Sequence, residues 1–406
     1  MPHHDFLTVR RRSLHLAEPL SSEDCCAQSM PDASPVKWHL AHTSWFFETF
    51  ILEAHEQGFQ PFHQAFRVLF NSYYNGVGAK HPRAQRGLLT RPSLDEVRAY
   101  RQDVDRRMAR LLAERPADAA LAALVELGLQ HEQQHQELIL TDLKHLLAQN
   151  PLYPAYAREP LARAAAPAPL AWIPCAGGLT DIGFDGSGFC FDNELPRHRA
   201  YVAPFELASR LVTNGEYLAF IEAGGYRDPA LWLAEGWDKV ASGELAHPLY
   251  WRQAGGGGWQ EFTLHGLQPL DPARPATHLS LYEADAYARW CGARLPTEFE
   301  WECAAAEANA AAGGAAGRLH PDAAAGAGLA QLFDACWQWT SSSYAPYPGY
   351  APAPGAIGEY NGKFMVNQYV LRGASCATPA GHARASYRNF FPAGARWQFT
   401  GIRLAR

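Results

Sequence analysis

The sequence lacks the long apolar run that a membrane span or a secretory signal needs. No stretch of the 406 residues approaches about 18 consecutive apolar positions, and the N-terminal segment MPHHDFLTVRRRSLHL has no apolar core. It also lacks the basic excess typical of nucleic-acid binders, since 35 lysines and arginines stand against 41 aspartates and glutamates. We therefore expect a cytoplasmic protein with neither a nucleic acid nor a membrane as partner.

Closely spaced cysteine pairs of the CxxC type are absent as well. The eight cysteines are scattered along the chain, apart from Cys25 and Cys26, whose direct adjacency suits neither a CxxC site nor an easy bridge. This pattern excludes the disulfide framework of a small secreted domain. We expect reduced and mostly buried thiols.

The composition divides the chain into two parts. Helical periodicity dominates the first 150 residues and predicts four long helices: one over 6–17, one over 35–56, one that opens at Ser93 and is periodic as far as Leu111, and one from Pro116 to about 150. Ser34 with Pro35, and Ser93 with Glu96, are typical helix-start pairs. From Leu170 the chain is rich in Gly, Trp and Tyr, with short apolar runs and many turns. We therefore predict an α+β protein with a four-helix bundle over 1–154, a linker over 155–169 and a second domain over 170–406.

One predicted helix carries a metal-binding pattern. His131 and His135 are four residues apart, so their imidazoles share one helix face, and Gln134 shares that face too. Two histidines at this spacing are a common metal grip. Glu132 follows the first histidine, as in zinc proteases. The downstream third ligand of that pattern is missing, however, and Gln134 has no role in it.

A third ligand is expected from the helix that starts at Pro35. It offers His39 and His42, and we favour His42 because it lies one turn before Trp45 and Phe46 on the expected inward face. His39 remains the alternative. Three neutral imidazoles can hold zinc, iron, nickel or copper, and they leave positions open for substrate and for O₂ or water.

At this point the sequence resembles a known family. The stretches KWHLAHTSWFFETF and HEQQHQE resemble the metal-binding half of the sulfoxide synthases of ergothioneine biosynthesis, a DinB-like four-helix bundle. The stretches ARLPTEFEWECAAA, DACWQWTSS, LRGAS and FTGIRLA resemble the formylglycine-generating-enzyme domain, which has a C-type-lectin-like fold. True formylglycine-generating enzymes need a reactive cysteine pair near the C-terminus, and here that region has Cys376 alone. The second half is therefore interpreted as a recruited scaffold.

The resemblance implies a non-heme Fe(II) enzyme that uses O₂ as co-substrate. It implies that His42, His131 and His135 bind the iron and that Gln134 hydrogen-bonds the imidazole of the substrate. The implied reaction joins the sulfur of cysteine, or of γ-glutamylcysteine, to C2 of the hercynine imidazole and oxidises that sulfur to a sulfoxide.

The resemblance also implies roles for residues outside the histidine motif. Arg83 and Arg86 would clamp the carboxylate of the thiol substrate; without the resemblance they are two solvated loop arginines. Tyr73 and Tyr74 match a tyrosine pair typical of one branch of the family; they would serve the oxygen chemistry, or else would only pack. In the same branch Asn389 would bind the substrate carboxylate, and Phe390 and Phe391 would form aromatic walls of the pocket.

Other functions remain open from the sequence. The same chemistry could use a selenium donor, as in selenoneine synthesis. A DinB-type metal-dependent thiol transferase or hydrolase is a second possibility, and a lectin-like binding protein with a structural metal is a third.

Overall fold

The computed structural model describes residues 2–186, 188–308, 318–326 and 328–406. Contacts divide the chain into two compact units. Unit 1 comprises Met1–Pro151 and Ala353–Tyr360, and unit 2 comprises Leu152–Pro352 and Asn361–Arg406. The first is helical and the second contains the sheets, which confirms the predicted α+β class. The predicted domain boundaries at 154 and 170 stay a prediction.

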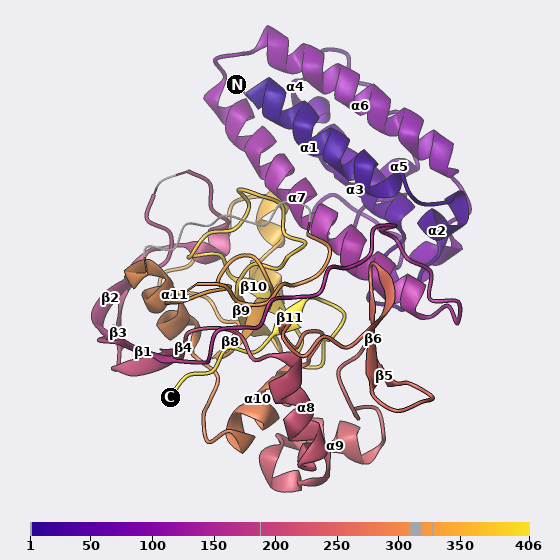
Figure 1. Cartoon of the computed structure of the whole chain (residues 1–406). Coiled ribbons are helices and arrows are strands. Elements are labelled where there is room, and N and C mark those ends of the chain that lie inside the picture. Colours follow the sequence, from indigo (N-terminus) through magenta and orange to yellow (C-terminus); the bar gives the residue numbers. More distant parts are fainter. Residues whose placement is uncertain (1, 187, 309–317, 327) are drawn as a thin grey trace. The chain divides into compact units, whose positions relative to one another are not determined.

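Four long helices lie side by side in unit 1 (Figure 1). They are α1 (Pro2–Ala17), α3 (Val36–Phe47), α6 (Leu94–Glu114) and α7 (Ala119–Ala148). Helices α1 and α3 each pack against both α6 and α7. The shorter helices of this unit are α2 (Ser22–Cys26), α4 (Glu53–His55) and α5 (Phe66–Leu69). Because α3 packs on α7, side chains from these two helices meet in the bundle core.

The predicted helix starts are partly correct. The capping box of Ser93 and Glu96 opens α6 as expected. The Ser34 cap is wrong, since Pro35 is the N-cap of α3 without a side-chain bond, and the Ser34 hydroxyl accepts from the Arg86 guanidinium instead. The last long helix begins at Ala119 rather than Pro116, because the Asp118 carboxylate accepts from the Leu121 amide and caps it.

The helix predicted over 35–56 is interrupted. Helix α3 ends at Phe47, and a π-helix over Glu48–Leu52 joins it to α4. π-Turns are rare and are usually found at functional sites. Here the π-turn carries Phe50, whose ring contacts the rings of Trp45 and Tyr74.

Unit 2 contains short strands grouped in small sheets. The largest sheet has the order β10-β9-β8-β11, antiparallel except for the parallel β11–β8 pair. Its strands are β8 (Trp337–Ser343), β9 (Tyr369–Gly373), β10 (Asn389–Phe391) and β11 (Thr400–Gly401). The two-stranded sheets are β1 (Trp172–Cys175) with β4 (Phe205–Ala208) and β2 (Gly178–Ile182) with β3 (His198–Val202). A three-stranded sheet contains β5 (Trp251–Gln253), β6 (Trp259–Thr263) and β7 (Gly266–Pro269).

The helices of unit 2 are α8 (Asn214–Glu222), α9 (Ala234–Ala241), α10 (Leu281–Trp290) and α11 (Glu298–Glu307).

A buried ionic network fixes the position of β10 in this unit. The Glu298 carboxylate at the start of α11 accepts from Arg372 of β9 and from Arg388, which directly precedes β10, each at 2.9 Å. Charges buried this deeply require partners, so the network fixes α11, β9 and the start of β10 relative to one another.

The structure bears on two further features of the chain, membrane-spanning helices and the state of the cysteines. Among the helices of the described ranges, none combines the length and the apolar character that crossing a membrane requires. The eight cysteines are free thiols, and five of them are buried: Cys25 in unit 1 and Cys175, Cys303, Cys336 and Cys376 in unit 2.

Candidate metal centre

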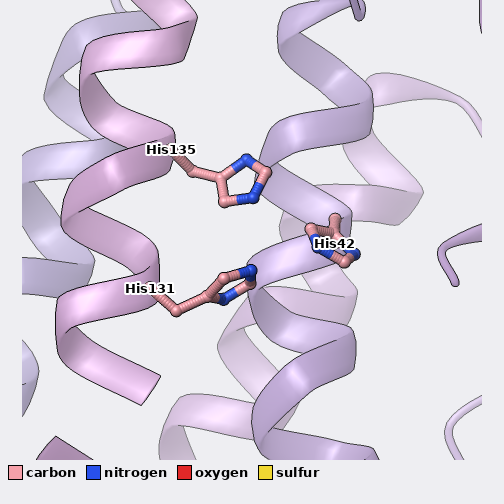
Figure 2. A group of neighbouring side chains, drawn as sticks. All are labelled: His42, His131 and His135. Carbon is pink, nitrogen blue, oxygen red and sulfur yellow. The ribbon is translucent and has the colours of Figure 1, made fainter. Parts of the chain in front are cut away.

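Three histidines converge in the core of the bundle (Figure 2). His131 and His135 project from α7 and His42 projects from α3, toward a common space. One ring nitrogen from each lies within 4.8 Å of the others, and all three side chains are buried. The spacing of four residues on α7 and the packing of α3 on α7 together explain why they meet.

The nitrogen atoms of these histidines suit a metal. His42 Nδ1 donates to the carbonyl oxygen of Phe70 at 2.6 Å, which leaves His42 Nε2 as a lone-pair donor without a hydrogen-bond partner. Neither ring nitrogen of His131 has a partner among the described residues. Buried polar atoms left unpaired are costly, and a bound metal would satisfy them.

Electrostatics keep the three imidazoles in the form that binds metals. Burial lowers the pKa of His131 to about 4, and burial lowers the pKa values of His42 and His135 well below the usual histidine value. The rings are therefore neutral at physiological pH, which is the protonation state that ligates a divalent transition metal. The donor set thus fits a three-histidine site.

His39, the alternative third ligand, lies outside the trio. Its Nδ1 lies 2.8 Å from His135 Nδ1, and its Nε2 lies 3.1 Å from Asp142 Oδ2. Both ring nitrogens are therefore occupied by hydrogen bonds, whereas His42 Nε2 is not. This contrast favours His42 over His39 as the ligand.

Glu132, the residue that resembled a protease base, has a different role. Its carboxylate accepts from Ser13 at 2.6 Å, from Arg101 at 2.8 Å and from Arg10 at 2.9 Å, all on α1 and α6. Burial raises the pKa of Glu132, but the charges of Arg10 and Arg101 outweigh burial and lower this pKa to about 2. A carboxylate held this firmly by two cations is a weak base, so the zinc-protease interpretation loses its general base.

The two predicted clamp arginines differ in their surroundings. Arg86 is buried and donates to the hydroxyls of Ser34 and Ser72, while its Nε has no hydrogen-bond partner among the described residues. Burial, followed by the charge of Arg83, lowers the pKa of Arg86 to about 9, and the smaller opposing effects of Tyr73 and Asp142 do not offset this. Arg83 is exposed and donates to the Asp32 carbonyl.

The Trp38 indole contacts both Arg86 and a histidine of the trio. The Arg86 guanidinium carbon lies 3.4 Å from the centre of the Trp38 ring, and His42 stacks on the same indole at 4.5 Å between ring centres. Trp38 therefore makes both a cation–π contact and an aromatic stack. It brings a buried positive charge close to the candidate metal site.

Tyr73 and Tyr74 lie on the loop that follows α5. Their rings are 4.9 Å apart and their hydroxyls are hydrogen-bonded, and the Tyr74 ring lies 5.6 Å from Trp45, a neighbour of His42. Asn71 holds the loop, since its side chain bonds to both the amide and the carbonyl of Tyr74. Burial raises the pKa values of both phenols, so both keep their protons.

Sequence reasoning missed two residues, Glu359 and Tyr360, that contact this loop from a segment far along the sequence. The Glu359 carboxylate accepts from the amides of Asn75 at 2.9 Å and Gly76 at 2.6 Å, and the Tyr360 ring lies 5.2 Å from that of Tyr73. A Cβ at Gly76 would come within 2.8 Å of a Glu359 oxygen, so the segment approaches very closely. No local pattern announces such a contact; only the grouping of Ala353–Tyr360 with unit 1 reveals it.

The remaining predicted substrate residues are divided between the two units. Gln134 is half-buried on α7, one turn from His131. Asn389, Phe390 and Phe391 form β10 in unit 2. There Phe390 stacks on Tyr344 at 4.1 Å between ring centres, and Phe391 meets Trp397 at 5.8 Å. Their roles toward a substrate stay predictions.

Comparison with known protein families gives two matches that follow each other along the chain. Residues 5–139 match the DinB superfamily, and residues 161–325 match the sulfatase-modifying factor enzyme 1-like domain. The first match contains all three histidines of the trio. The order of the two matches is the order that the sequence motifs predicted.

Curated relatives match over nearly the whole chain. The hercynine oxygenase of Mycobacterium tuberculosis is 32% identical across 98% of this chain and 96% of its own length. That of Mycolicibacterium smegmatis is 30% identical across 98% and 96%. Ergothioneine biosynthesis protein 1 of Schizosaccharomyces pombe is 30% identical across 54% of this chain and 28% of its own length. With this extent of similarity and both family matches in the same order, the chain belongs to the hercynine oxygenase family.

Proposed function

We propose that this chain is a non-heme Fe(II), O₂-dependent sulfoxide synthase. It joins the sulfur of cysteine or γ-glutamylcysteine to C2 of the hercynine imidazole and oxidises that sulfur to a sulfoxide. The observation that carries the proposal is the buried trio of neutral histidines in a hercynine oxygenase relative, with lone-pair nitrogens directed at one space. The oxygenase names of the relatives support O₂ as the oxidant.

The metal would be held by His42, His131 and His135. When bound there, Fe(II) supplies open coordination positions for the substrates and the electrons with which O₂ reduction begins. Neutral imidazoles require no proton loss before binding it, because their pKa values are lowered by burial.

Arg86 would bind the carboxylate of the thiol substrate. Its guanidinium is buried, has hydroxyls as its hydrogen-bond acceptors, and contacts the Trp38 indole, on which His42 also stacks. A planar guanidinium forms paired, charge-assisted bonds with a carboxylate. Such a bond would hold the substrate carboxylate beside the Trp38 indole, which also contacts His42.

The other substrate would be oriented by Gln134 and by aromatic rings. A glutamine amide both donates and accepts, so it can fix the rotation of an imidazole ring. Hercynine carries a trimethylammonium group, which aromatic faces such as those of Phe390 and Phe391 attract, and Asn389 would bind its carboxylate. These assignments come from the family resemblance.

The phenol pair would hold the proton needed for oxygen chemistry. Both hydroxyls stay protonated, since burial raises their pKa values, and they are hydrogen-bonded to one another. A positioned acid with its proton in place is what general-acid catalysis needs. We favour Tyr74 as the donor, because its ring contacts Trp45 next to His42.

The test is an oxygen-electrode assay on protein loaded anaerobically with Fe(II). Hercynine is supplied with cysteine or with γ-glutamylcysteine, and products are identified by mass spectrometry. We expect O₂ uptake that needs Fe(II) and both substrates, with a sulfoxide as product. A matched sample loaded with Zn(II) should be inactive. Turnover with zinc in the absence of O₂ would instead establish a hydrolase or transferase, and no turnover with either thiol would refute the proposal.

A further inference from the structure

A hydrogen-bonded chain of side chains extends behind one of the three proposed ligands. His39 Nδ1 lies 2.8 Å from His135 Nδ1, and His39 Nε2 lies 3.1 Å from Asp142 Oδ2. Asp142 follows His135 by seven residues on α7, which is two helical turns, so both side chains lie on the same face. All three are buried, and therefore the protein rather than bulk water determines where the protons lie.

The carboxylate sets the first proton position. Asp142 Oδ2 already accepts from the backbone N–H of Ser34 at 2.8 Å. A carboxylate oxygen can only accept, so His39 must donate to it from Nε2. The other ring nitrogen, His39 Nδ1, faces His135 Nδ1, so Nε2 is the nitrogen of His135 that remains to bind a metal. An imidazole that binds a metal through Nε2 carries its proton on Nδ1, so in this site His39 Nδ1 is the acceptor.

The accepting nitrogen of His39 determines the state of the next ring. The facing atom, His135 Nδ1, must donate, so the single proton of the neutral His135 ring is on Nδ1. The lone pair of that ring then lies on Nε2. His42 reaches the same state by donating from Nδ1 to the Phe70 carbonyl.

We infer that His39 and Asp142 are positioning residues that hold His135 in the tautomer whose Nε2 binds the metal. This inference rests on the proposed three-histidine site. Ligating histidines commonly donate their second N–H to a carboxylate or carbonyl, which fixes the ring and makes it a better donor. Here an intervening imidazole connects the ligand to the carboxylate.

The same geometry separates this role from that of a ligand. If His39 bound the metal through Nδ1, the lone pair of that atom could not also accept a proton from His135. The two Nδ1 atoms would then lie 2.8 Å apart with no hydrogen bond between them. If His39 instead carried two protons, His135 Nδ1 would accept and Nε2 would hold the proton, so His135 could not bind the metal through Nε2. The two alternatives therefore predict different metal affinities and a different tautomer.

The first experiment measures Fe(II) affinity on the full-length apo-protein, anaerobically and without substrate, by competition with a coloured chelator. Because no turnover is involved, the result is independent of the proposed reaction. Loss of a supporting residue typically weakens metal affinity 10–100-fold, and we expect that loss for His39→Ala. Asp142→Asn should cause a smaller loss in the same direction, since the amide oxygen still accepts but carries no charge.

Two control variants set the smallest and the largest expected loss of Fe(II) affinity. Thr141→Ser, next to Asp142 and equally buried, keeps its hydroxyl and should bind within twofold of the wild type. His42→Ala should lose binding altogether. Unchanged affinity in both His39→Ala and Asp142→Asn would overturn the inference, and so would a loss in His39→Ala as complete as that in His42→Ala, which would make His39 a ligand.

A second measurement observes the hydrogen-bonded chain in the wild-type protein and uses a substitution only to assign a signal. Long-range ¹H–¹⁵N correlation spectra of the apo-protein, labelled at histidine, distinguish protonated from bare ring nitrogens, with His135→Gln used to assign the signal. We expect a proton on Nδ1 and a bare Nε2 for His135. The opposite tautomer, or a doubly protonated His39, would overturn the inference even if the variants fail to fold.

Discussion

His131 and Glu132 are adjacent on one helix, are both buried in the same bundle, and have opposite surroundings. The Glu132 carboxylate is surrounded by donors from Ser13, Arg10 and Arg101. The His131 ring has no hydrogen-bond partner on either nitrogen among the described residues. A satisfied buried group contributes to the stability of the fold, whereas a buried group left unpaired costs about 1–3 kcal/mol. The comparison teaches that burial alone does not identify a site, whereas unused nitrogen atoms on three converging histidines indicate one.

The largest expected effect comes from replacing the histidines whose nitrogen atoms are left without partners. Replacing His42, His131 or His135 by Ala removes one of three ligands, so we expect a sharp fall in iron content and no detectable turnover. Metal analysis and product formation by mass spectrometry measure both. Full iron and full activity in His42→Ala would show that another residue, with His39 the first to test, completes the site.

The tyrosine pair is an intermediate case, since its hydroxyls are hydrogen-bonded to one another. If one of them supplies a proton, Tyr73→Phe or Tyr74→Phe should lower sulfoxide formation about 10²–10⁴-fold, with folding and iron content intact. Oxidation of the thiol alone to a sulfinate can continue, so both products are measured. Tyr360→Phe serves as a matched control on the neighbouring ring. Unchanged rates and product ratios in both single variants and in the double variant would leave the pair a packing role only.

Replacing Glu132, the residue whose hydrogen bonds are all made, is expected to lower the stability of the fold. Glu132→Gln leaves Arg10 and Arg101 without their shared buried anion, and breaking such a group typically costs about 3–5 kcal/mol. Chemical unfolding of the apo-protein at neutral pH measures it. A change below about 1 kcal/mol would contradict the structural role of Glu132.

The pH dependence of that difference has a definite sign. The folded pKa of Glu132, about 2, lies below its ordinary value of 4.5. The stabilisation from its ionised form is therefore complete above pH 4.5 and is lost as the pH falls toward 2. The stability gap between wild type and Glu132→Gln should accordingly narrow through this interval. A gap that widens on acidification would contradict the ionic network.

The smallest effect is expected at the arginines. Losing a charge-assisted carboxylate contact costs about 1.5–3 kcal/mol, so Arg86→Ala should raise the KM for the thiol about tenfold or more while the KM for hercynine changes little. The exposed Arg83, bonded to a backbone carbonyl, should matter less. Steady-state kinetics with each substrate varied in turn measure both. Equal effects on the two substrates would indicate general damage to the core.

The histidine face of α7 could be predicted from sequence because it depends on helical spacing alone, as does the capping box of Ser93. The partners of Glu132 could not, since Arg10 and Arg101 come from two other helices and no periodicity links them to position 132. The same holds for Glu359, which reaches the tyrosine loop from the far end of the sequence. The π-turn after Phe47 was missed because its residues suit an α-helix equally well. Tertiary partners, rather than local propensity, decide such features.

The most direct test of the central claim is an anaerobic Fe(II) titration of the apo-protein, comparing wild type with His131→Ala. The unsatisfied nitrogens of the trio predict one ferrous ion per chain in the wild type and no specific binding in the variant over the same concentration range. Circular dichroism of both samples verifies that the helices are retained. One ion per chain bound by His131→Ala with unchanged affinity would contradict the claim that this trio is the metal site.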